Sequence, residues 1–410
     1  MSLDRVVITG CGAVSPYGQG VEALVEGIWA ARSTVQLMPE WGRIGGLNSL
    51  LAAPVPELPV KKMLSRNLRR TMGPMAVYAA LAAREAVARA AFSEEYLASG
   101  EVGVSVGSTT GSPSAYEDFY RSYLPDEAID GIKSGEFFKI MGHSCAANIC
   151  LTLGIRGEQW APVSACASAC QAIGLGYLLV KTGRQQAVLC GGADEVHPSV
   201  TGVFDVVRAA SQCNTQPAAA PRPFDRDRDG VVCGGGSGIL VLENYRTARA
   251  RGAEILGEII GFGNVCDSEH IANPHEDAMA GAMRKALEEA GIDRSQVDYV
   301  NAHATGTLQG DRAEAQAIGM VVGPETAVSS CKGHIGHTLG AAAALESIVV
   351  LEMLRRQEIV PTLNLVNPDP ACAVVDLIDK LEKRNLKTVL KNNFALGGVN
   401  SALVIRRLEP

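Results

Sequence analysis

Short apolar runs alternate with longer amphipathic or Ala-rich stretches along the whole chain. Buried strands are predicted at residues 5–9, 102–107, 187–191, 239–242, 254–262, 299–303, 389–393 and 402–406. Helices are predicted at residues 21–31, 69–91, 137–153, 276–290, 311–318 and 339–354. Residues 37–59 and 211–228 are rich in loop-forming residues. This alternation favours mixed sheets that are covered by helices.

The most unusual stretch is residues 161–184, in which a short apolar lead-in reaches Cys166 and an Ala-, Ser- and Gly-rich run follows. The pattern predicts that Cys166 lies in the first turn of a buried helix. Gly174 and Gly176 each weaken an isolated helix by about 1 kcal/mol, so dense packing must hold it. A cysteine at a helix N-terminus has its thiolate favoured, which makes Cys166 a candidate nucleophile. The alternative is an inert core cysteine.

A second Ala-rich stretch begins at His337 and ends at Arg356, nearly half a chain further on. We therefore expect two homologous halves, residues 1–250 and 251–410, with their buried helices back to back. Chance similarity between two Ala-rich helices is the alternative.

Composition places the chain among ordinary globular proteins, with 47% hydrophobic and 20% charged residues. The net charge of −7 gives no sign of nucleic-acid binding. Eleven cysteines without a C-x-x-C pair indicate reduced thiols in the cytoplasm and no metal site. The first residues have no basic and apolar leader pattern, so we expect no signal peptide, and with no uncharged apolar run of sufficient length we expect no membrane span.

Two further segments contain residues that could act with Cys166. His303 ends an apolar strand in N-A-H-A-T-G-T, and Lys332, His334 and His337 follow one another in K-G-H-I-G-H. A buried lysine requires a partner, and Glu314 is the predicted one. The turn in N-N-F-A-L-G-G-V-N can present backbone N–H groups to an anionic oxygen. A cysteine, two histidines and such a loop suit carbon–carbon bond formation between thioesters.

These motifs, in this order, resemble the β-ketoacyl-acyl-carrier-protein synthases of the elongating type (synthase I/II), over residues 5–407. The resemblance rests on S-A-C-A-S-A, P-R-P-F-D-R-D-R-D-G, N-A-H-A-T-G-T, K-x-x-x-G-H-x-x-G-A-A and N-N-F-x-x-G-G-x-N. It implies an α/β thiolase-like fold with two pseudo-symmetric halves, layered α-β-α-β-α around buried central helices. It also implies decarboxylative Claisen condensation of an acyl group on Cys166 with malonyl carrier protein, in fatty acid or type II polyketide or polyene elongation.

The resemblance assigns a role to each matching residue. Cys166 would be the nucleophile, His303 and His337 the decarboxylation pair, and Lys332 an orienting group. The backbone N–H groups of Cys166 and Leu396 would form the oxyanion hole. Supporting and phosphopantetheine-binding roles would fall to Glu314, Phe394, Thr305 and Thr307. No cofactor is expected other than the phosphopantetheine that arrives on the carrier protein. The family usually has F-G-F-G-G in the last loop, where this chain has Ala395 and Leu396, so the acyl-chain preference stays open.

An acyl carrier protein is the expected partner. The segment V-K-K-M-L-S-R-N-L-R-R has five basic residues and no acidic one, and its spacing places Arg66, Arg69 and Arg70 on one helical face. We expect this face to dock the carrier protein, the alternative being a solvated helix end. A homodimer formed through residues 137–153 and 187–191 is expected, and a heterodimer with a sister subunit stays open.

Other classes fit less well. A Rossmann dinucleotide site is suggested by Gly10 and Gly12 but fails at Ser15, and residues 234–238 lack the lysine of a P-loop. A non-condensing partner subunit of the chain-length-factor type would lack the cysteine. A degradative thiolase would need a second cysteine in a glycine-rich motif, which Cys372 does not provide. A priming synthase would pair its cysteine with His and Asn.

Overall fold

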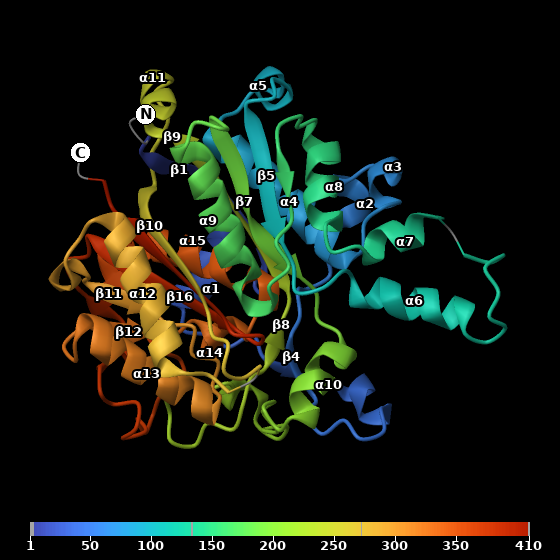
Figure 1. The fold of residues 1–410 in the computed structure, drawn as a ribbon. Coiled ribbons are helices and arrows are strands. Elements are labelled where there is room, and N and C mark those ends of the chain that lie inside the picture. The colour runs from blue at the N-terminus through green and yellow to red at the C-terminus, as the bar shows by residue number, and fades with distance from the viewer. Residues whose placement is uncertain (1–3, 133, 272, 409–410) are drawn as a thin grey trace.

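The computed structural model describes residues 4–132, 134–271 and 273–408. One large mixed sheet runs through the molecule (Figure 1). Its strands, in spatial order, are β14 (Asp376–Leu377), β12 (Ala327–Ser329), β11 (Tyr299–Asn301), β16 (Thr388–Ala395), β17 (Val399–Arg406), β10 (Gly257–Cys266), β1 (Val6–Ser15), β9 (Gly236–Asn244), β7 (Ala187–Asp194), β5 (Val102–Gly107) and β6 (Gln159–Trp160).

The two parts of this sheet repeat one topology. With the two-residue strands β2 and β14 left aside, each part places its third, second, fourth, fifth and first strands in that order from the outside inward, which gives β6-β5-β7-β9-β1 and β12-β11-β16-β17-β10. In both parts the second strand is parallel to its two neighbours, and the later pairings are antiparallel. The parts join where Val6, Val7 and Ile8 of β1 meet β10. The predicted pseudo-symmetric α/β fold is confirmed, whereas the boundary at residue 250 stays a prediction.

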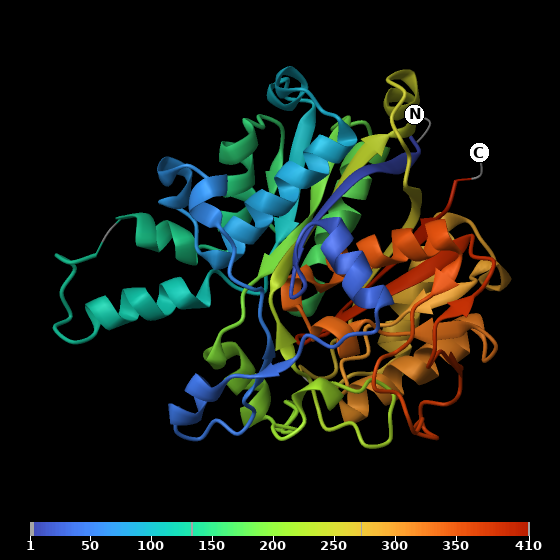
Figure 2. The ribbon, with the colours of Figure 1, turned by 180° about the vertical axis from the view of Figure 1, so that it is seen from behind.

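Helices form the remaining layers. α4 (Pro74–Ala90) packs on β1 and β9, and α12 (Glu276–Ala290) packs in the same way on β10 and β17. α9 (Ser168–Lys181) and α15 (Ala342–Arg356) lie between the two parts of the sheet and contact each other (Figure 2). Glycines at corresponding positions of β1 and β10 allow α4 and α12 to pack closely on the sheet. A Cβ on Gly10 would lie 2.3 Å from the carbonyl of Ala86, and one on Gly261 would lie 2.1 Å from that of Ala286.

The predicted dense packing around α9 is present. A Cβ on Gly174 would lie 2.4 Å from the ring of Phe262, and one on Gly176 would lie 2.0 Å from Cys190 Sγ. These two positions therefore accept the lower helix propensity of glycine because no larger residue fits.

The start of the second central helix differs from the prediction. α14 (Lys332–Ile335) precedes His337, and a 3-10 turn, η5 (Leu339–Ala341), leads into α15. The turn η2 (Ala165–Ala167) leads into α9 in the same way. Each turn opens with a residue of positive φ, 48° at Ala165 and 53° at Leu339. The residue equivalent to Cys166 is therefore Gly340, and not His337.

Two other predicted helices are each divided. Residues 69–91 contain the end of α3 (Arg66–Arg69) and α4, because Gly73 and Pro74 break the helical pattern. Residues 137–153 divide into α7 (Ser134–Ile140) and α8 (Ser144–Leu153). The remaining elements are α1 (Val21–Trp29), α2 (Val60–Met63), α5 (Glu94–Ala98), α10 (Pro198–Val206), α11 (Tyr245–Ala250), α13 (Leu308–Val322), β2 (Gly18–Gln19), β3 (Gln36–Leu37), η1 (Pro39–Arg43), β4 (Leu51–Ala53), η3 (Pro217–Ala219), β8 (Cys233–Gly234), η4 (Arg294–Gln296), β13 (Glu358–Ile359) and β15 (Glu382–Lys383).

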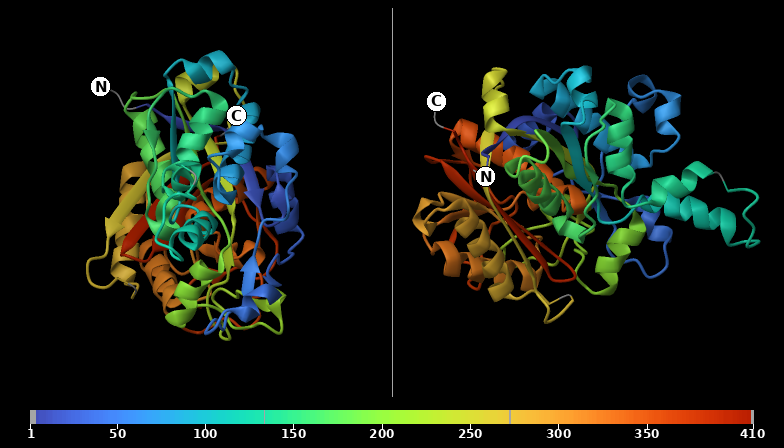
Figure 3. Two further views of the ribbon diagram at one scale, coloured as in Figure 1. Left: turned by 90° about the vertical axis from the view of Figure 1, so that its right-hand side faces the viewer. Right: turned by 45° about the horizontal axis from the view of Figure 1, so that its top comes forward.

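An arm formed by α6 (Pro113–Tyr123) and α7 projects from the body of the molecule (Figure 3). Its exposed apolar side chains include Tyr120, Leu124, Ile129 and Phe137. Strand β7, in contrast, is paired on both sides by β5 and β9, so the prediction that residues 187–191 form an assembly surface is wrong. None of the helices in the described ranges has both the length and the apolar character to cross a membrane.

Candidate active site

The turn η2 places Cys166 directly before α9 and within the core of the molecule. The side chain of Ser168 fixes this turn, because its Oγ accepts the N–H of Ser164 at 2.9 Å and donates to the carbonyl of Ala165 at 2.7 Å. Small residues on either side allow the neighbouring elements to approach the cysteine. The predicted position of Cys166 at the start of a buried helix is confirmed.

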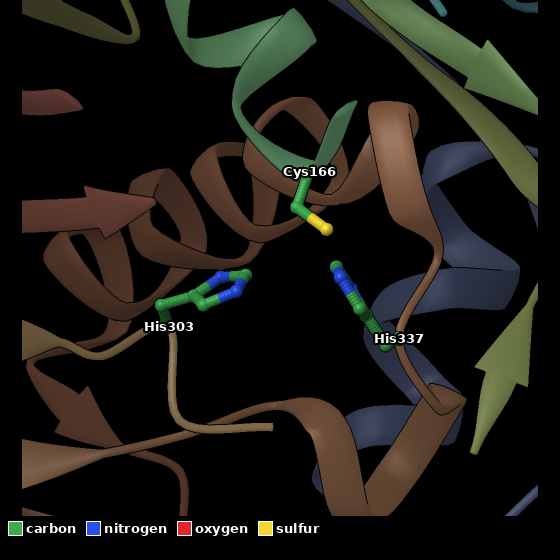
Figure 4. Close-up of side chains that lie close together, drawn as sticks. All are labelled: Cys166, His303 and His337. Atoms are coloured by element: carbon green, nitrogen blue, oxygen red, sulfur yellow. The ribbon is translucent and has the colours of Figure 1, made fainter. Parts of the chain in front are cut away.

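His303 and His337 meet at Cys166 (Figure 4). His303 follows β11, and His337 lies between α14 and η5, where its N–H donates to the carbonyl of Val232 at 2.7 Å. The sulfur and one nitrogen of each ring all lie within 4.8 Å of one another. The ring centroids are 5.1 Å apart and the ring planes are nearly perpendicular, at 84°. Both imidazoles can therefore contact the same small group when it is held beside the sulfur.

Both imidazoles are neutral at pH 7. Burial holds the pKa of His303 and of His337 well below the usual range, and the nearby cations of Lys332 and Lys391 lower both further. Within the described part of the chain, neither ring nitrogen of His337 has a hydrogen-bond partner. A neutral imidazole can donate one hydrogen bond to a substrate, and His337 has no competing contact.

The thiol of Cys166 differs from the prediction. Burial raises its pKa to about 12, although the positive charge of Lys332 acts in the opposite direction. Enclosure of the sulfur therefore opposes the thiolate that the helix N-terminus is expected to favour.

The predicted partner of Lys332 is also wrong. Lys332 is fully buried and forms its ion pair with Glu346 of α15, whose other oxygen lies 2.7 Å from the Nζ of buried Lys391. Lys332 of α14 thus pairs with a carboxylate of α15 and not with Glu314 of α13. Glu314 instead accepts the backbone N–H groups of His303 at 2.8 Å and Ala304 at 2.7 Å. It therefore fixes the strand end that carries His303, and burial raises its pKa to about 7.

Sequence reasoning missed Glu346 and Lys391. A signal was available, because Glu346 is the only charged residue in A-A-A-A-L-E-S-I-V-V and Lys391 interrupts the apolar strand T-V-L-K. An isolated charge in a buried element needs a counter-charge.

A cleft of about 530 Å³ leads to Cys166. The predicted site residues that line it are Cys166, His303, His337, Thr305, Thr307, Glu314, Phe394 and Leu396. Lys332 lies behind this lining, with its ammonium group on Glu346. The structure thus brings the predicted cleft residues together around the sulfur.

The loop that carries Leu396 covers one side of the cleft. Gly397 donates its N–H to the carbonyl of Ile271 at 2.8 Å, and Gly398 accepts the N–H of Asp267 at 2.7 Å. Gly397 and Gly398 both have positive φ, 88° and 74°, a conformation that glycine adopts without strain. Leu396 remains 43% exposed. The role of its N–H in an oxyanion hole stays a prediction.

The predicted docking residues lie apart from the cleft lining. Arg66 and Arg70 are exposed, whereas Arg69 is partly buried and donates from Nε to the carbonyl of Leu64 at 3.1 Å. α3 is only four residues long. Arg66 and Arg70 are therefore the members of this set that are free to meet a partner.

Among the described residues, Cys166, His303 and His337 are also close enough to hold a metal ion together. The buried cations of Lys332 and Lys391, with one carboxylate between them, leave a net positive charge beside this trio. Such a charge opposes the binding of a cation. The expectation of no metal site stays a prediction.

Comparison with known families identifies the chain. Residues 3–248 match the family described as "Beta-ketoacyl synthase, N-terminal domain", and residues 256–366 match "Beta-ketoacyl synthase, C-terminal domain". The chain belongs to the β-ketoacyl synthase family. As a β-ketoacyl synthase it is an acyltransferase that performs a condensation in fatty acid or polyketide elongation. A non-condensing role is not favoured.

Relatives cover the whole length of this β-ketoacyl synthase. The 3-oxoacyl-[acyl-carrier-protein] synthase 2 of Vibrio cholerae is 32% identical over 419 residues, covering all of both chains. Nodulation protein E of Rhizobium meliloti (strain 1021) is 34% identical, covering 98% of this chain and 99% of its own. A β-ketoacyl synthase structure from Burkholderia phymatum superposes with a TM-score of 0.96 and 40% identity, covering 99% of this chain and all of its own. The ishigamide ketosynthase/chain length factor gives a TM-score of 0.92 at 30% identity, with the same coverage.

Proposed function

We propose that this β-ketoacyl synthase takes an acyl group from an acyl carrier protein onto Cys166 and condenses it with a malonyl group on a second carrier protein. The observation that carries the proposal is the meeting of one thiol and two neutral imidazoles within 4.8 Å at the base of a cleft. Several of the relatives are themselves named 3-oxoacyl-[acyl-carrier-protein] synthases.

In the first step the sulfur of Cys166 attacks the acyl thioester. The new S–C bond forms, the bond to the phosphopantetheine sulfur breaks, and the proton of Cys166 passes to the departing thiol. The backbone N–H groups of Cys166 and Leu396 stabilise the oxyanion of the tetrahedral intermediate. Because the free thiol has a pKa of about 12, the attack and the proton transfer are closely coupled.

In the second step the malonyl thioester loses carbon dioxide. His303 and His337 donate hydrogen bonds to its thioester oxygen, which carries the enolate charge as the C–C bond to the carboxylate breaks. The enolate carbon attacks the acyl carbonyl, the S–C bond to Cys166 breaks, and the departing thiolate takes a proton from solvent water. The product is a β-ketoacyl carrier protein. Thr305 and Thr307, 3.3 Å apart at the cleft wall, contact the phosphopantetheine arm.

Separate assays of the two steps test this assignment. Cys166→Ala should abolish acyl-enzyme formation and condensation. His303→Ala and His337→Ala should still form the acyl-enzyme, seen by mass spectrometry, and should lose decarboxylation of malonyl carrier protein. His143→Ala, an exposed histidine outside the cleft lining, is the control and should behave as the parent. Condensation by Cys166→Ala at the parent rate would refute the proposal.

Docking of the acidic carrier protein is assigned to exposed Arg66 and Arg70, with Lys61 and Lys62 nearby. Arg66→Glu combined with Arg70→Glu should lower kcat/KM for carrier-bound substrate, and the difference from the parent should shrink as salt rises. Arg284→Glu with Lys285→Glu makes the same charge change on exposed positions of α12 and should leave kcat/KM unchanged. Equal losses in both pairs would show a general charge effect and no docking site.

We also propose that the enzyme pairs with another ketosynthase-like chain, a second copy or a sister subunit. The apolar arm and the exposed end strand β6, with Trp160 and Val163, support this proposal. The ishigamide ketosynthase/chain length factor, to which the chain is similar, is named for two such components. Light scattering of the purified chain distinguishes a dimer from a monomer of 43.1 kDa.

A further inference from the structure

Lys391 is a second fully buried lysine that the proposed mechanism does not use. It lies on β16, and its Nζ contacts three acceptors: the carbonyl of Asn392 at 2.6 Å, Oδ1 of Asn393 at 2.8 Å and Oε2 of Glu346 at 2.7 Å. An ammonium group has three N–H donors and no acceptor. Lys391 therefore donates two hydrogen bonds, to Asn392 and Asn393, and its charge is paired with Glu346.

This arrangement determines the orientation of the Asn393 amide. The oxygen and nitrogen of an asparagine side chain are otherwise hard to distinguish. Because Lys391 can only donate, the atom of Asn393 that faces it must be the oxygen. The other atom, Nδ2, then faces Nδ1 of His303 at 3.4 Å, at the long end of hydrogen-bond distances.

The orientation of the Asn393 amide in turn determines which nitrogen of the His303 ring carries the proton. Nδ2 of Asn393 is a donor, so Nδ1 of His303 must accept with its lone pair. In a neutral imidazole the single proton then resides on Nε2, the nitrogen that remains to address the substrate. Two other neighbours of His303 do not set the tautomer: Glu314 accepts the backbone N–H, and the ring of Phe394 lies 6.3 Å away between centroids.

We propose that Lys391 is a positioning residue that acts through Asn393 to hold His303 as the Nε2–H tautomer, with its donor directed at the thioester oxygen of the substrate. The inference rests on the proposed function for the direction of that donor. It adds a series of contacts that ends at His303. Lys391 pairs with Glu346 and donates to the oxygen of Asn393, and the NH₂ group of Asn393 then donates to Nδ1 of His303.

Nitrogen NMR of the enzyme labelled with 15N in its histidine rings tests the tautomer without any substrate. The His303 signals are assigned by their loss in His303→Gln. In the parent, Nδ1 should have the shift of a bare nitrogen and Nε2 that of a protonated one. In Asn393→Asp, a near-isosteric change, one carboxylate oxygen still accepts from Lys391 and the other faces His303. Nδ1 should then become protonated.

Kinetics provide the second readout. Asn393→Leu and Lys391→Met remove the constraint, so decarboxylation should fall about 100-fold, the loss typical of one missing oxyanion donor. Acylation of Cys166 should stay within about threefold of the parent, because it does not use this donor. Ser347→Ala, next to Glu346 on α15 and bonded only to its own helix at Ala343, is the matched control and should retain both rates.

A parent His303 that carries its proton on Nδ1 would overturn the inference, whatever the variants do. So would a tautomer and a decarboxylation rate that are both unchanged in the Asn393 and Lys391 variants. These results are distinct from failure of the proposed function, which would appear as a parent enzyme that does not decarboxylate malonyl carrier protein at all.

Discussion

Glu346 is the single carboxylate between two buried lysines, and its replacement by Gln should strongly destabilise the fold. The set of Lys332, Lys391 and Glu346 has a net charge of +1 in the parent. In Glu346→Gln this charge rises to +2 with no counter-ion. The two lysines lie on different oxygens of Glu346, so the amide would present its oxygen to one lysine and its NH₂ group to the other.

The structure gives the magnitude. At 2.7 Å between charges and an effective dielectric constant near 20, one such pair is worth about 6 kcal/mol before desolvation is subtracted. Removal of one partner from a buried pair typically costs ~3–5 kcal/mol of unfolding free energy. Lys391→Met should cost less, about 1–3 kcal/mol, because it loses one ion pair and two hydrogen bonds but leaves one lysine paired with one carboxylate and no uncompensated charge.

Urea unfolding followed by circular dichroism, at one fixed protein concentration, measures these differences. Ser347→Ala should lie within about 1 kcal/mol of the parent. The charge argument predicts an order, with Glu346→Gln less stable than Lys391→Met and Lys391→Met less stable than Ser347→Ala. A loss below about 1 kcal/mol for Glu346→Gln, or a larger loss for Lys391→Met, would refute it.

Three further predictions concern separate features. Gly12→Ala and Gly263→Ala should each destabilise by about 1–3 kcal/mol in urea unfolding, because each new Cβ would lie 2.0 Å from a helix carbonyl, whereas Gly45→Ala, with nothing within 4 Å, should change little. Burial raises the pKa of Asp194 to about 7, so the folded state holds its proton more tightly than the unfolded state. The unfolding free energy of Asp194→Asn relative to the parent should then rise with pH, by up to about 1.4 kcal/mol per unit between pH 4 and 7; a flat difference would contradict this. Alkylation of Cys166 by iodoacetamide should accelerate roughly tenfold per pH unit from pH 7 to 9, and a plateau below pH 8 would show a thiolate at rest.

Sequence patterns predicted the ends of those helices and strands that are bounded by nearby residues such as Gly and Pro. The strand Val102–Gly107 and the helix Glu276–Ala290 have the predicted bounds, because Gly and Pro or a clear periodic pattern limit both. The start of the second central helix was not predicted correctly. Leu339 adopts positive φ without being a glycine, and only the surrounding structure can impose that conformation.

The residues of the site likewise fall into those that local motifs predict and those that depend on tertiary contacts. Motif spacing selected Cys166, His303 and His337 as candidates, and the fold brings these three residues together. The partner of Lys332 depends on how α14 faces α15, which is a tertiary relation that no local pattern records. The role of Lys391 likewise depends on contacts between β16 and α15.

The equivalence of Cys166 and Gly340 has a consequence for the stoichiometry of acyl loading. A Cβ at Gly340 would lie 2.6 Å from Oδ2 of Asp194 and 2.8 Å from the backbone nitrogen of Thr109. The second half therefore repeats the turn of the first but leaves no room for a thiol within it. Under the proposed function we therefore expect one acyl group per chain, on Cys166, however long the incubation with acyl donor, because a cysteine at Gly340 would clash with Asp194 and Thr109 of the first half.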